Sequence, residues 1–431
     1  MSRRAISRRD FVKGGVLAAA AAGFPGIARG RSAEKLRIAV VGTGNQADWN
    51  LRQIAGEQVV ALCDVDSNYL DKAAAAHREA RRFRDFREML SASIDFDAVL
   101  VAAPDHIHRP AAAMALRRGK HVYCEKPLAH SVEEVRTLSR LAAEKKLVTQ
   151  MGIQIHAGGN YRRVVELVRS GAIGRIREVH VWCERAWSGG RYGEAKPAPA
   201  HLDWNLWLGP AAEHAFCDGI HPAEWRRFWS YGAGTLGDMA CHHLDLPFWA
   251  LDLKHPRTIQ AEGPPVDAVG APAWLIVRYE FPEEGGRPPV TVTWYDGGKR
   301  PERLAALKTK EGAALEWGDG TLFVGEEGLV IADYGRHLLL RDNQATDFTP
   351  PEKSIPESIG HHAEWIAACK AGSATTCNFD YAGVLTEAVL LGVVSYRVGR
   401  KLDWNAKELR AAGCPEADRY IRHEYRKGWE L

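Results

Sequence analysis

The sequence lacks several features that define membrane, nucleic-acid-binding or fibrous proteins. No apolar run in its 431 residues reaches the roughly 18 to 20 residues of a membrane-spanning helix, so a permanent span is not expected. Its 57 Lys and Arg nearly balance its 54 Asp and Glu, and the net charge of +3 gives no support to nucleic-acid binding. With 46% hydrophobic and 26% charged residues, the composition excludes a disordered, collagen-like or coiled-coil chain.

Metal-binding and disulfide patterns are also missing. None of the eight cysteines lies in a CxxC motif, so neither a disulfide framework nor a Cys-rich zinc site is expected. His361 and His362 are adjacent, but only Glu364 follows them at ligand spacing, and the sequence predicts no metal. Tryptophan, by contrast, is abundant at 14 residues, which indicates either a large aromatic core or a cleft where indole rings stack on a sugar.

The N-terminus reads as a targeting signal. Arg8 and Arg9 lie in SRRDFVK and precede the apolar stretch GGVLAAAAAGFPGIA, with small residues near Ala28 and Ala33. This pattern is typical of a twin-arginine (Tat) export signal, so residues 1–33 are excluded from the predicted fold. We therefore expect recognition by the Tat export machinery and a periplasmic or other extracytoplasmic location.

A glycine-rich turn near residue 42 predicts a dinucleotide site. The β-rich run 36–41 ends at Gly42-Thr43-Gly44-Asn45-Gln46-Ala47, which opens a predicted helix. Gly42 permits a tight turn, Gly44 lets the backbone approach a pyrophosphate, and the helix start at Asn45 and Gln46 offers N–H groups to phosphate. Asp64 ends the next predicted strand, where a carboxylate can bond ribose hydroxyls and repel a 2′-phosphate, so NAD is favoured over NADP.

The predicted fold class is α/β with two domains. Strands and helices alternate up to about residue 155, which predicts a parallel sheet and an N-terminal Rossmann dinucleotide-binding domain over 34–155. Residues 156–405 are predicted to form a substrate-binding α+β domain with a large, mostly antiparallel sheet, and 406–431 a C-terminal tail. The expected strands of the second sheet include 273–281, 290–295, 304–310, 322–324 and 329–333.

A polar stripe marks the helix predicted after Gly232. Asp238, His242, Asp245 and Trp249 are spaced four, three and four residues apart, so on a helix they share one face. Such a stripe is unusual for a plain core helix, and it predicts a functional surface.

The segment AAPDHIHRPAAAMALRRGKHVYCEKPLA, residues 102–129, resembles the signature of the Gfo/Idh/MocA oxidoreductase family. Its Glu125-Lys126-Pro127 tripeptide is the most specific part, and the resemblance extends over about residues 35–405. The resemblance implies an open second sheet whose face covers the nicotinamide. It also implies that Lys126 lies beside the nicotinamide and the substrate hydroxyl. The residues that it implies on the cofactor side are His108 and Glu125. Pro104 is a further cofactor-binding candidate, because it begins the loop at the carboxyl end of a predicted parallel strand.

The family carries a D-x-x-x-H pair that corresponds to Asp238 and His242, and it usually has Asn where this chain has Asp105. We expect His242 to act as general base, Lys126 to hydrogen-bond the same hydroxyl, and Asp238 to orient the base or the substrate. Further substrate-binding candidates on the predicted cleft are His156, Asn160, His221, Trp225 and Arg226.

The first functional hypothesis is an exported NAD(H)-dependent oxidoreductase acting on a secondary hydroxyl of a sugar, glycoside or cyclitol. The alternative is a glycoside-cleaving lyase or hydrolase that works through a transient keto-sugar with bound, recycled NAD; it needs a second acid/base, for which His156, His221 and His361 are candidates. A non-catalytic sensor is disfavoured because Lys126, Asp238 and His242 are all present. An exposed sheet face predicts a homo-oligomer, either a dimer or a tetramer.

Overall fold

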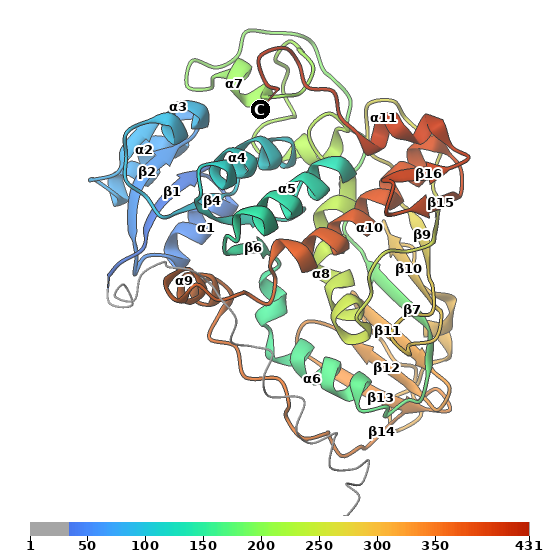
Figure 1. The fold of residues 1–431 in the computed structure, drawn as a ribbon. Helices are drawn as coiled ribbons and strands as arrows, with labels where there is room; N and C mark the ends of the chain where they lie inside the picture. Colours follow the sequence, from blue (N-terminus) through green and yellow to red (C-terminus); the bar gives the residue numbers. More distant parts are fainter. Residues whose placement is uncertain (1–33, 431) are drawn as a thin grey trace, which may run out of the picture. The chain divides into compact units, whose positions relative to one another are not determined.

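The computed structural model describes residues 34–430, so the predicted export signal lies outside the described residues. The N-terminal sheet has six parallel strands in the order β3-β2-β1-β4-β5-β6 (Figure 1). The order reverses between β1 and β4, and ligands bind at such a switch point in open parallel sheets. The strands are β1 (Arg37–Val41), β2 (Gln58–Cys63), β3 (Arg81–Phe83), β4 (Ala98–Val101), β5 (His121–Glu125) and β6 (Thr149–Gly152).

Local sequence explains where the helices of this domain begin. Asp66 and Asp85 each accept a backbone N–H at a helix start, and Ser131 forms a capping box with Glu134. All four residues of β4 are apolar and buried, as expected for a parallel strand covered on both faces. The helices are α1 (Gln46–Gln53), α2 (Ser67–Ala76), α3 (Phe86–Ser91), α4 (Asp105–Arg117) and α5 (Val132–Lys145).

The second sheet has ten strands in the order β14-β13-β12-β11-β7-β10-β9-β8-β15-β16. Only the β7–β10 pair is parallel, so the sheet is mostly antiparallel and the predicted fold class is confirmed. The strands are β7 (Ile176–Cys183), β8 (Thr258–Glu262), β9 (Ile276–Phe281), β10 (Val290–Asp296), β11 (Gly320–Gly325), β12 (Leu329–Ala332), β13 (His337–Arg341), β14 (Gln344–Thr346), β15 (Leu402–Asn405) and β16 (Arg410–Ala412).

The strand predicted over 304–310 is wrong. The chain there forms the 3-10 helix η3 (Glu302–Ala306), followed by isolated bridges at Lys308. Leu307 is the buried residue of this stretch, while its neighbours on both sides are exposed, so no alternating face exists to pack on the sheet.

The remaining helices are η1 (Gln154–Ala157), α6 (Gly159–Arg169), α7 (Trp204–Leu208), η2 (Glu224–Arg227), α8 (Gly234–Leu251), α9 (His361–Ala371), α10 (Phe379–Val398), η4 (Pro415–Ala417) and α11 (Asp418–Ile421).

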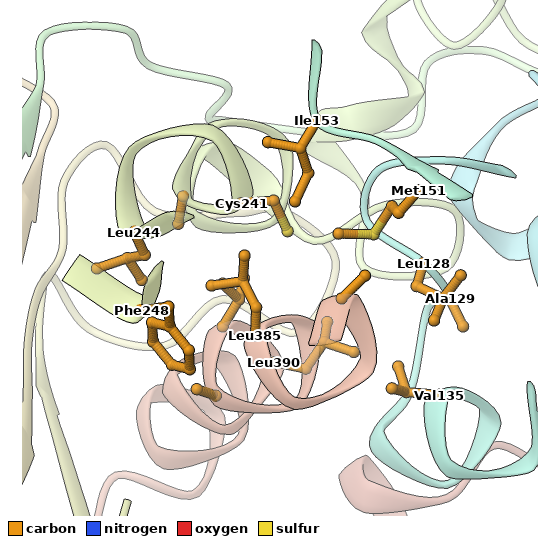
Figure 2. Close-up of a cluster of buried hydrophobic side chains, with 14 of the residues drawn as sticks. Leu128, Ala129, Val135, Met151, Ile153, Cys241, Leu244, Phe248, Leu385 and Leu390 are labelled. Carbon is orange, nitrogen blue, oxygen red and sulfur yellow. The ribbon is translucent and has the colours of Figure 1, made fainter. Parts of the chain in front are cut away.

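Helix α10 joins the two domains. Helix α10 runs between α5 and α8 (Figure 1), where Leu385 and Leu390 meet Cys241, Leu244 and Met151 (Figure 2). It is long and apolar enough to cross a membrane. However, 78% of its most apolar 18-residue stretch is buried inside the protein, which identifies it as a core helix.

The last segments cross the predicted domain boundaries. Trp365 of α9 is fully buried in the same apolar cluster as Ile38 and Leu100 of the first domain, although α9 lies in the predicted second domain. The predicted tail at 406–431 starts inside the β15–β16 hairpin, and its Trp429 packs on Phe86. Helix α9 and the C-terminal tail thus both pack against the first domain.

Candidate functional site

A cavity lies at the switch point of the parallel sheet, at the carboxyl ends of β1, β2, β4 and β5. It brings together all nine residues predicted to bind the cofactor: Gly42, Gly44, Asn45, Gln46, Asp64, Pro104, His108, Glu125 and Lys126. The second domain contributes the remaining wall through Trp207, His221, Trp225, Arg226 and His242. The cavity therefore extends from the glycine-rich loop after β1 to His242 on helix α8.

The glycine loop fits a dinucleotide. Gly42 has a φ of 85°, and a Cβ there would lie 2.5 Å from the carbonyl oxygen of Ala102. A Cβ at Gly44 would lie 2.6 Å from the Tyr69 ring, on the side of the loop that lines the cavity. The side chain of Asn45 does not cap α1, so the helix start is not closed by its own side chain. These features suit close approach of a pyrophosphate.

Asp64 supplies a carboxylate at the ribose position. It accepts hydrogen bonds from Thr43 N at 2.8 Å, Thr43 Oγ1 at 3.0 Å and Asp66 N at 2.9 Å. Because a carboxylate has about four acceptor positions, about one is left for a ribose hydroxyl. Burial raises the pKa of Asp64, although these hydrogen bonds oppose the shift.

The two glycines should respond differently to alanine. Gly42→Ala is expected to lower the free energy of unfolding by about 1–2 kcal/mol or more, because a left-handed backbone and the immobile Ala102 carbonyl both resist a side chain. Gly44→Ala is expected to weaken NAD binding about tenfold or more with a smaller loss of stability, because the Tyr69 ring can shift. Urea unfolding and NAD titration measure the two effects, and equal stability losses would contradict this distinction.

Asp238 is the centre of a charged cluster between the domains. Its Oδ1 accepts from Lys126 Nζ at 2.6 Å and from Arg226 Nε at 2.9 Å, while Trp187 Nε1 donates to Oδ2 at 2.6 Å. Lys126 also donates to the Asp238 backbone carbonyl at 2.6 Å. Burial alone would raise the pKa of Asp238, but the charges of Lys126 and Arg226 outweigh it and hold the pKa well below its usual range. Asp238 is thus an anion that fixes Lys126.

His242 lies one helical turn after Asp238 and lines the same cavity. Within residues 34–430, its ring makes no hydrogen bond, so both nitrogens are available to a ligand. Burial, followed by the nearby charge of Lys126, lowers the pKa of His242 well below its usual value. The imidazole is therefore neutral at physiological pH and can accept a proton.

Glu125 and His108 hold the loops around Lys126. Glu125 accepts from Asn50 Nδ2 and Gln154 Nε2, both at 2.9 Å, and burial raises its pKa. The ring nitrogens of His108 lie 2.7 Å from the Pro127 carbonyl oxygen and 2.8 Å from that of Ala103. These contacts tie the ends of β4 and β5 together and set the direction of Lys126.

Asp105 stands where the family that the sequence resembles usually has asparagine. The residue is buried, with 4% of its surface exposed. Within the described part of the chain, it bonds no neighbouring side chain and lies near Arg226, Asp238 and Lys126. Burial raises the pKa of Asp105 to about 8, so the carboxyl is mostly protonated at neutral pH. A neutral carboxyl can donate one hydrogen bond, as an asparagine amide does.

Asp105→Asn is expected to stabilise the protein increasingly as the pH rises. Between the usual pKa of 3.8 and about 8, the folded state keeps a proton that the unfolded state has lost, so the wild type loses unfolding free energy with rising pH. The asparagine variant lacks this loss, which amounts to at most about 1.4 kcal/mol per pH unit. Urea unfolding of both proteins from pH 5 to pH 8 tests this, and a difference independent of pH would contradict it.

The structure does not bring every predicted substrate ligand to Lys126. His156 Nδ1 bonds Asp245 at 2.9 Å, its ring stacks on Trp249 at 4.1 Å, and it does not line the cavity. Asn160 donates to the carbonyl oxygens of Asp333 and Arg336, and it does not line the cavity either. The predicted polar stripe of α8 is therefore divided. His242 lines the cavity and Asp238 bonds Lys126, which lines it too. Asp245 instead bonds His156, outside the cavity.

His221, Trp225 and Arg226 do line the cavity, in different parts of it. His221 Nε2 lies 2.9 Å from Asp66, the N-cap residue of α2, which places His221 on the same side of the cavity as Asp64. The Arg226 guanidinium lies 4.2 Å from the centre of the Trp225 ring and reaches Asp238. Arg226 is thus part of the Lys126 cluster, whereas His221 belongs to the nucleotide half.

The histidine pair at the start of α9, and the acid that follows it, are engaged in hydrogen bonds within the protein. The Nε2 atom of His361 bonds the Met151 carbonyl, that of His362 bonds Asn50, and Glu364 accepts from Thr376. Two other groups place potential ligand atoms within 4.8 Å of one another: His156, Asp245 and Cys377, and Cys183, His243 and Asp319. In the first group, the direct hydrogen bond between His156 and Asp245 explains why their side-chain atoms lie close together.

The sequence alone did not single out Trp187 and Gln154 as functional residues. Trp187 lies in an irregular segment after β7 and donates to Asp238, and Gln154 lines the cavity and donates to Glu125. The abundance of tryptophan was the only signal for Trp187, because its partner lies 51 residues away in the sequence.

Comparison with known proteins identifies the family of the two domains. Residues 36–153 match the NAD-binding Rossmann fold of the GFO_IDH_MocA oxidoreductase family, and residues 161–290 match that family's C-terminal alpha/beta domain. The chain is 34% identical over 152 residues to inositol 2-dehydrogenase 3 of Saccharopolyspora erythraea, covering 34% of this chain and 44% of the relative. It is 31% identical over 145 residues to scyllo-inositol 2-dehydrogenase (NADP(+)) of Bacillus subtilis, covering 33% and 43% of the two chains. Each match thus spans less than half the length of the relative.

The solved structure of GenD2, from gentamicin A biosynthesis and in complex with NAD, shares the fold. Its TM-score is 0.60 at 21% sequence identity, over 86% of this chain and 97% of that chain. The two family domains together cover more than half of the 431 residues, and they lie in the expected order. These matches confirm the predicted NAD-binding domain and the predicted family: the chain belongs to the Gfo/Idh/MocA oxidoreductase family.

Proposed function

We propose that the protein is an NAD-dependent oxidoreductase that acts on a secondary hydroxyl of a sugar, glycoside or cyclitol. The observation that carries the proposal is one cavity that joins the dinucleotide loop to Lys126 and His242, with Lys126 fixed by Asp238. The inositol dehydrogenases among its relatives support a polyol substrate. Asp64 at the ribose position supports NAD over NADP.

The residues divide the work on the substrate hydroxyl. NAD, when bound along the glycine loop, supplies the hydride acceptor. Neutral His242 takes the hydroxyl proton as general base, because its ring nitrogens have no other partner within residues 34–430. Lys126 donates a hydrogen bond to the same oxygen as it becomes a carbonyl, and Asp238 with Arg226 holds the Lys126 side chain in place.

The lyase alternative is not favoured. It requires a second acid/base near the sugar, but His156 is bound to Asp245 away from the cavity, and His361 is bound to the Met151 carbonyl. His221 lies on the same side of the cavity as Asp64, paired with Asp66. Of these three histidines, His221 is the one that lines the cavity, and its ring is already paired.

A direct experiment separates these activities. The purified enzyme is incubated with NAD or NADP and with myo-inositol, scyllo-inositol, glucose or a nitrophenyl glucoside, and both reduced nucleotide and released nitrophenol are recorded. We expect NADH formation with at least one polyol and a lower Kd for NAD than for NADP. Nitrophenol release without net NADH, or tighter NADP binding, would overturn the proposal.

We also propose export through the Tat machinery, on the strength of the Arg8-Arg9 motif. The double variant Arg8→Lys/Arg9→Lys is expected to keep the protein in the cytoplasm, because the twin arginine is the recognised element. Cell fractionation followed by immunoblotting measures this, with Arg3→Lys/Arg4→Lys as the matched control. Equal periplasmic accumulation of both variants would count against export by this route.

A homo-oligomer, either a dimer or a tetramer, remains part of the proposal. Its support is the large open sheet, a surface on which copies of such chains can pack. Sedimentation velocity of the purified protein tests it, and a single monomeric species would refute it.

A further inference from the structure

A second cavity of about 810 Å³ lies on the side of the molecule where the C-terminal segment packs over the end of α10. Its walls include His130 before α5, Trp229 after η2, Arg397 at the end of α10, Tyr420 in α11 and His423. No residue of this wall lines the dinucleotide cavity. Figure 1 shows α11 beside the C-terminal part of α10, where this cavity is formed.

Arg397 is a part-buried cation without a counterion. Its guanidinium lies 4.2 Å from the centre of the Tyr420 ring and 5.2 Å from that of Trp229. Among residues 34–430 it forms neither a hydrogen bond nor an ion pair. Burial lowers the pKa of Arg397, and the charge of Arg419 acts in the same direction. Since arginine stays protonated in proteins, the Arg397 guanidinium carries five N–H donors that have no acceptor among residues 34–430.

The neighbouring histidines offer further polar atoms. His423 makes no hydrogen bond within the described residues, and its ring centre lies 4.6 Å from that of His130. His130 Nε2 lies 3.1 Å from the Gly232 carbonyl, to which it donates, so its Nδ1 is left as an acceptor. Burial lowers the pKa of His130 to about 3 and that of His423 to about 4, so both rings are neutral at pH 7.

The carboxylates that line the second cavity are either bonded to other groups of the protein or exposed to solvent. Glu134 accepts from the backbone of His130 and Ser131 and from the Tyr425 hydroxyl. Asp418 pairs with Arg422 at 2.9 Å, and Glu424 is exposed. No carboxylate of the described chain therefore neutralises Arg397. Leaving a part-buried charge unpaired is costly, and a bound anion would remove that cost.

We propose that this second cavity binds a small oxyanion, a carboxylate or a phosphate, that also carries a hydroxyl group. Arg397 provides the bidentate contact to the oxyanion, as guanidinium groups do for planar and tetrahedral oxyanions. His423 donates a further hydrogen bond, and His130 Nδ1 accepts from the hydroxyl. Trp229 and Tyr420 line the cavity and contact the guanidinium with their rings.

Isothermal titration of the full-length protein at low salt tests the proposal with three probes: inorganic phosphate, glucuronate and glucose. We expect saturable binding of phosphate, of glucuronate or of both, and none of the neutral sugar at this site. Arg397→Gln should weaken that binding about tenfold or more. The control Arg78→Gln, an exposed arginine of the first domain, should bind like the wild type. Which anion binds identifies the source of the oxyanion.

Two results would overturn the site: no saturable binding of either anion to the wild type, or unchanged anion binding by Arg397→Gln. Circular dichroism checks that the Arg397 variant is folded. His423→Ala provides a second variant, because this ring has no hydrogen-bond partner in the described chain whose loss would unfold it. It should also weaken anion binding, and wild-type affinity in both variants would reject the proposal. NAD binding is measured in parallel and should stay unchanged, since the two cavities share no lining residue.

Discussion

Alanine at Lys126 or at His242 is expected to lower kcat by roughly 10²- to 10⁴-fold on a substrate of the proposed polyol oxidation. Both side chains line the cavity. In the proposed mechanism they act on one oxygen, His242 by removing its proton and Lys126 by hydrogen-bonding it. Because the two serve one proton transfer, the double variant should lose far less than the product of the two single losses.

The binding of NAD distinguishes the two variants. His242 comes from α8 of the second domain, so NAD affinity should change little in His242→Ala. Lys126 directly follows β5 and lines the cavity from the first domain, where we propose that the nicotinamide binds, so Lys126→Ala should change NAD affinity more. Near wild-type kcat in His242→Ala would remove this residue from the proposed mechanism. The base would then have to be sought at another histidine, and His221 is the predicted candidate that lines the cavity.

Asp238→Asn is expected to lower the free energy of unfolding by about 3–5 kcal/mol, the usual cost of removing one partner from a buried ion pair. The Asp238 side chain is 8% exposed and the Lys126 side chain 12%, and Arg226 bonds the same carboxylate oxygen. The substitution would leave two cations facing a neutral amide in a site with little water. Urea unfolding measures the loss.

The pH dependence of this loss has a definite sign. The folded-state pKa of Asp238 lies below its usual value of 3.8, so its stabilisation is complete above about pH 4 and is lost as the pH falls through the folded-state pKa. The difference between wild type and Asp238→Asn should therefore shrink only at strongly acidic pH. Asp71→Asn serves as the control, because Asp71 pairs with Arg82 on the surface with 68% and 57% of the side chains exposed, and such pairs contribute about 0–1 kcal/mol. Equal losses in the two variants would contradict the assignment.

Local patterns were sufficient for the first domain. The strand before Gly42, the helix after it and the acid at Asp64 are close in sequence, and a parallel sheet brings the carboxyl ends of its strands to one edge. The nine predicted cofactor residues therefore meet in one cavity. The prediction of a strand over 304–310 was wrong because that stretch has no alternating buried face. Whether a residue is buried depends on its tertiary neighbours, and the local sequence does not contain them.

The sequence by itself determined the two-domain α/β class, the dinucleotide loop, and the Asp238–His242 pair on one helix face, because turn chemistry and helical spacing are local properties. Only the tertiary structure decided which polar residues share the cavity. It turned His156 towards Asp245 and Asn160 towards the β12–β13 turn, and it brought Trp187 and Arg226 to Asp238. The physical reason is that a buried polar group must find a partner, and the partner is chosen by the packing of distant segments.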